Sequence, residues 1–200
     1  KLDKKPQTIG TFIDEKIQEN SNSVKGPGCG LYLTFQTKAK EQIQMQVGLS
    51  YTNIENARNN RDSEATGKSF DDVKNAAHQT WNEMLSRIQV EGGTPEDKTK
   101  FYTGLYHALL GRGIANDING QYIRHDKTVG QIPLDKNGIP LYSHHNTDGM
   151  WGGFWNLTQI WTLAYPEIFS SYIKSNLDFF KNSGWLHDGE AAGVYTNGVQ

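Results

Sequence analysis

The stretch that decides the fold is residues 69–111, SFDDVKNAAHQTWNEMLSRIQVEGGTPEDKTKFYTGLYHALLG. Its apolar residues recur every three or four positions, first from Phe70 to Ile88 and again from Phe101 to Leu109. This is the period of an amphipathic helix. Because a glycine pair at 92–93 separates the two runs, the sequence predicts two consecutive helices with a break between them.

Local signals mark the start of each helix. Ser69 and Asp72 have the spacing of a capping box, with Asp in place of the usual Glu. Thr94 and Pro95 have the residue types that are favoured at the N-cap and the first helical position, and two acids follow them in the first turn. We therefore expect the first helix to begin at about residue 70 and the second to run from 95 to Gly111.

The pattern changes to a period of two on the N-terminal side. Residues 42–50 alternate apolar and polar, residues 31–38 alternate less regularly, and a short charged link joins them. This pattern is typical of half-buried antiparallel strands and predicts a hairpin. A further strand is predicted at 11–13, a loop at 19–30 and a short helix at 53–61. The first fifty residues are therefore interpreted as the last strands of a sheet domain.

On the C-terminal side, residues 112–151 are predicted to form a long loop. The loop contains strand-like pieces at 121–124 and 129–132 and an Asn-Gly turn at 137–138. Helices are predicted from 155 to 164 and from Pro166 to Gly184. A loop of this length inside a compact domain is usually functional or disordered. The order predicts a sheet domain followed by a helical domain with functional loops at one end.

Composition excludes several classes of protein. The net charge is −2 and the Lys and Arg residues form no block, so we expect no nucleic-acid partner. No apolar run approaches the ~20 residues that span a bilayer. Cys29 is the single cysteine, which excludes an intramolecular disulfide and a cysteine-based zinc site. Since the chain begins at Lys1 and has no closing element at its other end, we expect it to be a piece of a longer polypeptide that supplies its main partner.

Residues 148–156 form the first candidate site, with the sequence Asp-Gly-Met-Trp-Gly-Gly-Phe-Trp-Asn. Tryptophan presents a flat apolar face, glycine lets the backbone approach a ligand closely, and Asp and Asn supply directed hydrogen bonds. This mixture suits a sugar ring. We predict Trp155, Asn156 and Asp148 as substrate contacts and Trp151 as a stacking platform. The alternative is a glycine-rich loop that leads into a packed helix.

Three other groups of residues could carry chemistry. His144 and His145 are adjacent and lack the spacing of a zinc motif, which favours a sugar-contacting or loop-stabilising role. Asp117 and the residues after it have the order of a turn, and they lack the downstream Glu of a calcium loop. Asp188 and Glu190 are carboxylates of the kind that glycoside hydrolysis requires, although solvated loop acids are the simpler interpretation.

Six motifs in order resemble glycoside hydrolase family 92, the α-mannosidases. The most specific is the Phe-Tyr-Thr-x-Leu-Tyr-His run at 101–107. The six motifs lie at residues 47–59, 81–82, 88–93, 98–107, 117–122 and 183–186. The order and spacing of the motifs match the family from about residue 43 to 131 and again from about 155 to 186.

The resemblance implies a fold, an activity and a location. Residues 1–53 would be the end of an N-terminal β-sandwich domain, 54–93 a helical linker, and 94–200 the first part of an (α/α)6 barrel. The implied activity is calcium-assisted, inverting release of α-linked mannose from glycans by a secreted, periplasmic or cell-surface enzyme. The family's catalytic acid and base, with most calcium ligands, would lie beyond Gln200. No catalytic or metal-ligating residue is therefore predicted in this chain.

One residue departs from the family pattern. The family usually has a Trp-Asp pair where this chain has Trp155-Asn156. The acidic role either passes to Asp148 or is lost, and losing a charge-assisted hydrogen bond costs about 1–3 kcal/mol. Two alternatives therefore stay open: an exo-acting hydrolase of another α-linked sugar, and a non-catalytic carbohydrate-binding relative.

Overall fold

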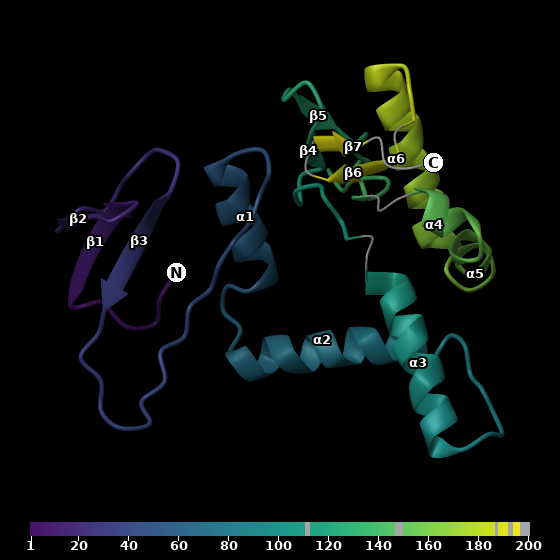
Figure 1. Ribbon diagram of the computed structural model, residues 1–200, viewed down its shortest axis with the longest axis horizontal. Helices are drawn as coiled ribbons and strands as arrows, with labels where there is room; N and C mark the ends of the chain where they lie inside the picture. Colours follow the sequence, from purple (N-terminus) through teal and green to yellow (C-terminus); the bar gives the residue numbers. More distant parts are fainter. Residues whose placement is uncertain (111–112, 147–149, 187, 192–193, 197–200) are drawn as a thin grey trace. The chain divides into compact units, whose positions relative to one another are not determined.

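The computed structural model describes residues 1–110, 113–146, 150–186, 188–191 and 194–196 (Figure 1). The chain divides into two compact units, Lys1–Val47 and Gly48–Gln200. The three-part division at residues 53 and 93 stays a prediction. None of the helices described combines the length and apolarity needed to cross a membrane.

The first unit contains a three-stranded antiparallel sheet in the order β2-β1-β3. The strands are β1 (Thr8–Ile13), β2 (Lys16–Glu19) and β3 (Cys29–Thr34). Aromatic rings of one strand cover glycines of the other, because Tyr32 is paired with Gly10 and Phe12 with Gly30. A Cβ at either glycine would collide with the facing ring, so these two positions require glycine for close approach. The predicted strand at 11–13 is confirmed as part of β1.

The predicted hairpin between 31–38 and 42–50 is wrong. The partner of β3 is β1, and the region 42–50 contributes only an isolated bridge between Met45 and Leu2. The first residues of the chain use the backbone hydrogen-bonding groups of this region: Asp3 N–H donates to Gln44 O (3.2 Å), and Gln46 N–H donates to Lys1 O (2.8 Å). The alternating side chains therefore cover no sheet face, and Met45 is 64% exposed.

The second unit begins with three helices whose starts follow the local signals. They are α1 (Ile54–Glu64), α2 (Phe70–Leu85) and α3 (Pro95–Leu110). The capping box at α2 is confirmed, since Asp72 N–H donates to Ser69 Oγ (3.1 Å) and Ser69 N–H to Asp72 Oδ2 (2.9 Å). Thr94 and Asp97 make the same reciprocal pair at α3.

Between α3 and the C-terminal helices, residues 113–146 are ordered by short turns. A hairpin joins β4 (Gln121–Ile123) and β5 (Val129–Gln131), at the two strand-like pieces expected from the sequence. The Asn-Gly turn also forms: Gly138 has φ 79°, and the Asp135 carboxylate accepts from the N–H groups of Asn137 and Ile139 (both 2.8 Å).

The C-terminal helices differ in detail from the prediction. In place of one helix over 155–164, the structure has α4 (Met150–Phe154) and α5 (Leu157–Ala164), separated by a turn at 155–156. The next helix, α6 (Pro166–Ser183), ends at Gly184 with φ 79°, as its sequence predicts. A final pair of strands, β6 (Gly189–Ala191) and β7 (Val194–Thr196), was not predicted.

An aromatic core joins α3, α5 and α6. Its buried members are Leu105, Leu157, Trp161, Tyr165 and Tyr172. The Tyr165 hydroxyl donates to Met84 O (3.0 Å), and the guanidinium of Arg87 lies over the Tyr165 ring while it pairs with Glu167. The core therefore also holds the end of α2. Small sheets followed by helices confirm the predicted mixed class; the β-sandwich and the (α/α)6 barrel stay predictions.

Candidate functional site

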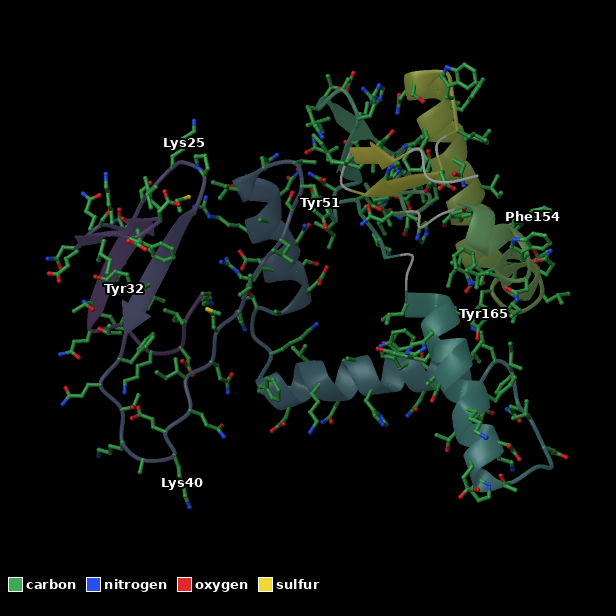
Figure 2. All side chains as sticks on the ribbon, in the orientation of Figure 1. Lys25, Tyr32, Lys40, Tyr51, Phe154 and Tyr165 are labelled. Carbon is green, nitrogen blue, oxygen red and sulfur yellow. The ribbon has the colours of Figure 1, made fainter. Side chains whose placement is uncertain are left out.

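The turn between α4 and α5 presents two aromatic side chains at the surface. Phe154 is 64% exposed and Trp155 is 63% exposed, with ring centroids 5.9 Å apart and planes at 64°. Figure 2 labels Phe154 among the side chains of this turn. Large exposed aromatic surfaces of this kind are typical of binding sites. Trp155 was predicted as a substrate contact from its sequence, whereas Phe154, in the same glycine-rich stretch, was not.

Asn156 follows the two aromatic residues and occupies the N-cap position of α5. Its φ of −155° and ψ of −20° do not place its side chain on the helix end, and it makes no capping hydrogen bond. An N-cap Asn normally uses its side-chain oxygen to accept from the backbone. The exposed carboxamide of Asn156 therefore faces solvent beside Trp155, where it can hydrogen-bond a hydroxyl.

The helix that carries this turn is firmly anchored. Leu157 is 9% exposed and Trp161 1% exposed, and the Trp161 ring meets Tyr172 edge-on at 5.5 Å. One face of α5 is thus buried in the aromatic core. The exposed residues at its start are consequently held in a defined place by the rest of the helix.

The side chains of the other two predicted site residues lie outside the described part of the structure. Asp148 lies outside the described residues. Trp151 lies in α4, but its side chain is outside the described part of the structure. The structure therefore describes the side chains of Trp155 and Asn156, with Phe154 next to them, and the substrate-contact roles predicted for all four site residues stay predictions.

His144 and His145 are buried, at 1% and 5% exposure. The His144 ring stacks on Tyr122 (3.8 Å between centroids) and meets Phe179 edge-on (4.8 Å). Burial among these rings lowers the pKa of His144 to about 3, and the neighbouring His145 contributes to the same shift. A neutral, stacked histidine fits the loop-stabilising role better than the sugar-contacting one.

Asp117 lies at the centre of a polar network and is 4% exposed. The network joins Asp117 to residues 50–60, and its donors to the carboxylate are Ser50 Oγ (2.9 Å), Thr52 Oγ1 (2.5 Å), Asn56 Nδ2 (2.9 Å) and Asn60 Nδ2 (2.8 Å). The sequence predicted a turn here, and Gly120 N–H does donate to Asp117 O (2.8 Å). The Ser, Thr and Asn residues of 50–60 were the signal that sequence reasoning missed.

No calcium ligand is assigned among the described residues. Within the part of the chain that the structure describes, no group of three or more His, Cys, Asp or Glu side chains could hold a metal ion. Both oxygens of the Asp117 carboxylate already accept from neutral donors. Asp188 is half-buried, and the side chain of Glu190 is outside the described part, so no carboxylate pair is assigned.

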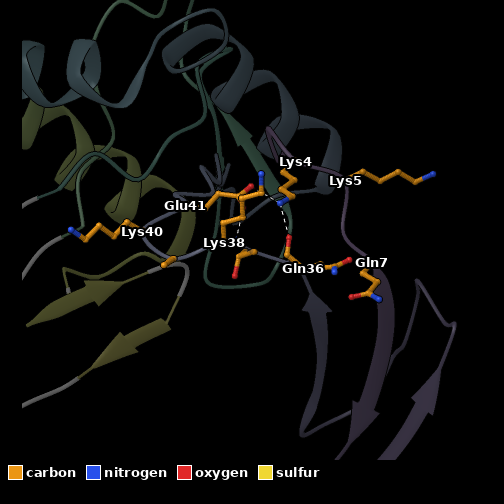
Figure 3. Close-up of a pocket in the computed structure, with 9 residues that line it drawn as sticks. Lys4, Lys5, Gln7, Gln36, Lys38, Lys40 and Glu41 are labelled. Carbon is orange, nitrogen blue, oxygen red and sulfur yellow. Dashed lines mark hydrogen bonds and ion pairs between the residues drawn. The ribbon is translucent and has the colours of Figure 1, made fainter.

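A depression in the first unit is lined by lysines, but their side chains do not point toward a common centre. Its walls include Lys4, Lys5, Lys38, Lys40 and Glu41. Lys4 Nζ pairs with Glu41 Oε1 (2.5 Å) and donates to Gln36 O (2.7 Å), while Lys5 and Lys40 extend away from this contact (Figure 3). The Lys4–Glu41 ion pair therefore holds residues 36–41 against the N-terminal segment.

Comparison with known proteins places these features in a family. Residues 56–200 match the model of the glycosyl hydrolase family 92 catalytic domain. The family GH92 inverting mannosidase BT2199 from Bacteroides thetaiotaomicron VPI-5482 matches with a TM-score of 0.78 at 23% identity, over 94% of this chain and 25% of that chain. The family GH92 α-mannosidase BT3965 from the same species matches with a TM-score of 0.78 at 21% identity, over 98% of this chain and 26% of that chain.

A protein described as an uncharacterized secreted glycosidase, from Arthroderma benhamiae, is 29% identical over 87 residues, which are 40% of this chain and 11% of that protein. This chain thus spans about a quarter of the solved structures that it resembles and a smaller share of this relative. At the identities of the two solved structures, the likeness shows a shared fold. Because the family model covers residues 56–200, the chain belongs to glycosyl hydrolase family 92, and that segment is part of the family's catalytic domain.

Proposed function

We propose that this chain is part of an exo-acting glycoside hydrolase that releases α-linked mannose from glycans with inversion of configuration. The observation that carries the proposal is the match of residues 56–200 to the family 92 catalytic domain. Solved structures described as family 92 mannosidases, one of them inverting, share the fold over nearly the whole chain and support it.

The α4–α5 turn supplies the proposed sugar contacts. Trp155 and Phe154 offer apolar ring surface to the C–H face of a pyranose, and the Asn156 carboxamide can both donate to and accept from its hydroxyls. Inverting hydrolysis also needs an acid and a base on opposite sides of the scissile bond. We assign neither role to a described residue, and we propose that both lie elsewhere in the complete enzyme.

Architecture, calcium and location belong to the same proposal. The first unit would be part of a β-sandwich domain, and the helices of the second would begin an (α/α)6 barrel. If the complete enzyme uses calcium, its ligands would come from outside the described residues. Export from the cell is supported by the relative described as secreted.

Asn156 motivates the second candidate, a hydrolase of a different α-linked sugar on the same fold. An amide in place of the family's usual carboxylate weakens a charge-assisted bond to sugar hydroxyls. The third candidate, a non-catalytic carbohydrate-binding relative, would bind sugars through the aromatic turn but release none. A panel of aryl α-glycosides separates the second candidate from the first, and sugar binding without turnover identifies the third.

The deciding experiment measures mannose released from an α-linked mannobiose by the intact protein, with and without a calcium chelator. We expect release that stops on chelation and returns with added calcium. The matched variant Asn156→Asp restores the family's usual carboxylate and should raise kcat/KM for mannosides. A folded protein that releases no mannose under any of these conditions, as wild type or as Asn156→Asp, would overturn the proposal.

A further inference from the structure

The segment 50–64, which contains α1, is attached to the rest of the second unit by polar groups. Ser50, Thr52, Asn56 and Asn60 all donate to the carboxylate of Asp117. Asn60 Oδ1 also accepts from Ile118 N–H (2.9 Å). The contacts therefore converge on one buried side chain in the loop 113–123.

Apolar contact contributes little to this attachment. The only buried residue of α1 is Asn56, and Ile54, its one large apolar residue, is 72% exposed. No Lys, Arg or His among the described residues forms an ion pair with Asp117. The docking of α1 thus depends on hydrogen bonds to one carboxylate, each of which depends on direction as well as distance.

The network has a single consistent orientation. Asn119 Oδ1 accepts from Gln121 N–H (3.1 Å), so Asn119 Nδ2 must be the atom that faces Asn56 Oδ1 (3.0 Å). Asn56 Nδ2 is then turned toward Asp117 Oδ2 (2.9 Å) and Gln121 Oε1 (2.7 Å). Because each amide fixes the next, the loss of the central acceptor takes a partner at once from Asn56, which is buried, and from three half-buried donors, Ser50, Thr52 and Asn60.

The segment also lies where the chain passes from one compact unit to the other. The second unit starts at Gly48, and a Cβ there would come within 2.0 Å of Ala57 O, so the backbone of Gly48 lies directly against α1. Asn60 Nδ2 further donates to Leu49 O (2.7 Å). Docking of α1 therefore fixes the point at which the chain enters the second unit.

We propose that residues 48–64 form a polar latch, closed by the Asp117 carboxylate, which opens as one piece while the aromatic core of α5 and α6 stays folded. The latch is a conformational device at the start of the second unit. Elements held by few buried apolar contacts open with a lower free energy than the core, and local opening of this kind is visible in hydrogen exchange. The inference does not depend on which sugar the enzyme cleaves.

Hydrogen exchange of the intact protein, followed by mass spectrometry, tests the latch. The variant Asp117→Asn keeps the shape of the side chain and removes its charge, and Asp126→Asn is the control, because Asp126 is an exposed carboxylate that serves only its own turn. In Asp117→Asn we expect the amides of 57–64 to exchange about tenfold faster or more, while those of 168–180 change less than about twofold. The control should leave both segments unchanged.

The result that overturns the proposal is equal acceleration of α1 and α6, or no acceleration of either, since both mean that α1 does not open separately. A milder variant guards against a general loss of folding. Thr52→Val removes one donor at nearly constant volume, and it should accelerate exchange in α1 alone by a smaller factor than Asp117→Asn. Faster exchange spread evenly over the second unit in Thr52→Val would also overturn the latch.

Discussion

Helices α5 and α1 are attached to the same compact unit by opposite means. Leu157 and Trp161 bury an apolar face of α5 among the rings of Tyr165 and Tyr172. Helix α1 buries only Asn56 and is held by hydrogen bonds to Asp117. Apolar burial is non-directional and roughly proportional to area. A buried polar network depends on every member being satisfied, so it is lost more abruptly.

Burial alone therefore does not describe how firmly a helix is held. Thr11, Asn56 and Asp117 are as inaccessible as the core aromatics. Their contribution nevertheless depends on partners, because an isolated buried polar group destabilises the fold. We therefore expect substitutions in the two regions to differ both in size and in how far their effects spread.

The largest expected effect is the loss of the core anchor. Replacing Trp161 with alanine removes a ring that is 1% exposed and leaves a cavity between α5 and α6. We expect a loss of about 3–5 kcal/mol in the free energy of unfolding, measured by urea denaturation. The control is Leu163→Ala on the same helix, where the side chain is 85% exposed. A similar loss in both variants would mean that α5 is not anchored through its buried face.

The second-largest effect is expected from a substitution in the hydrogen-bond network around Asp117. Asn56→Ala removes the donor shared by Asp117 and Gln121, and hydrogen bonds to charged groups contribute about 1.5–3 kcal/mol. We expect a loss of that size in the free energy of unfolding. Asn59 is an exposed asparagine of the same helix, so Asn59→Ala is the matched control and should change little. If the two variants are equally stable, the network does not stabilise the fold.

Acidification should weaken the His144 contact. The folded-state pKa of about 3 lies below the ordinary value of 6.5, so the unfolded chain takes up a proton that the folded chain excludes. This stabilising contribution is complete above pH 6.5 and is lost as the pH falls toward 3, with a loss of about 2 kcal/mol at pH 5.

The measurement is the difference in unfolding free energy between pH 7 and pH 5. His144→Phe keeps an aromatic ring against Tyr122 and Phe179 but cannot titrate, so we expect a smaller difference than in the wild type. His78→Gln, at an exposed site on α2, should keep the wild-type difference. A His144→Phe variant with the full wild-type pH dependence would contradict the assignment.

The smallest effect on stability is expected at the surface turn. Trp155 is 63% exposed, so Trp155→Ala should change the free energy of unfolding by less than about 0.5 kcal/mol. Its effect should appear with substrate: a rise in KM and a fall in kcat/KM of roughly tenfold for mannosides in the complete enzyme. Unchanged kinetics would show that the exposed rings at 154–155 are not a sugar platform.

Much of the helical part followed from the sequence. The caps at Ser69 and Thr94, Pro166 at the beginning of α6 and Gly184 at its end act within a few residues, and the structure confirms them. The alternation of 42–50 was misleading, because a strand also needs a partner strand. The backbone of this region is hydrogen-bonded to residues 1–3 instead. Family membership was predictable as well, from motifs spread along the chain and now matched over 56–200.

The candidate site was only partly predictable. The glycine- and aromatic-rich stretch indicated Trp155 and Asn156, but their exposure follows from which face of α5 is buried against the core. The same limit applies to His144, whose sequence neighbourhood gives no sign of the rings that enclose it. Tyr122 and Phe179 lie far from His144 along the chain and meet it only in the folded unit.

The starts of α2, α3 and α6, the tight turns and the order of sheet before helices could be predicted from the sequence. These depend on side chains that bond their own backbone and on glycines that accept positive φ, so the controlling residues stand within a few positions of each other. The partner strand of β3, the burial of His144 and the hydrogen bond from Asn56 to Asp117 were decided only by the tertiary structure. Such contacts join residues that are remote in the chain, and their free energy exists only once packing has excluded water from around them.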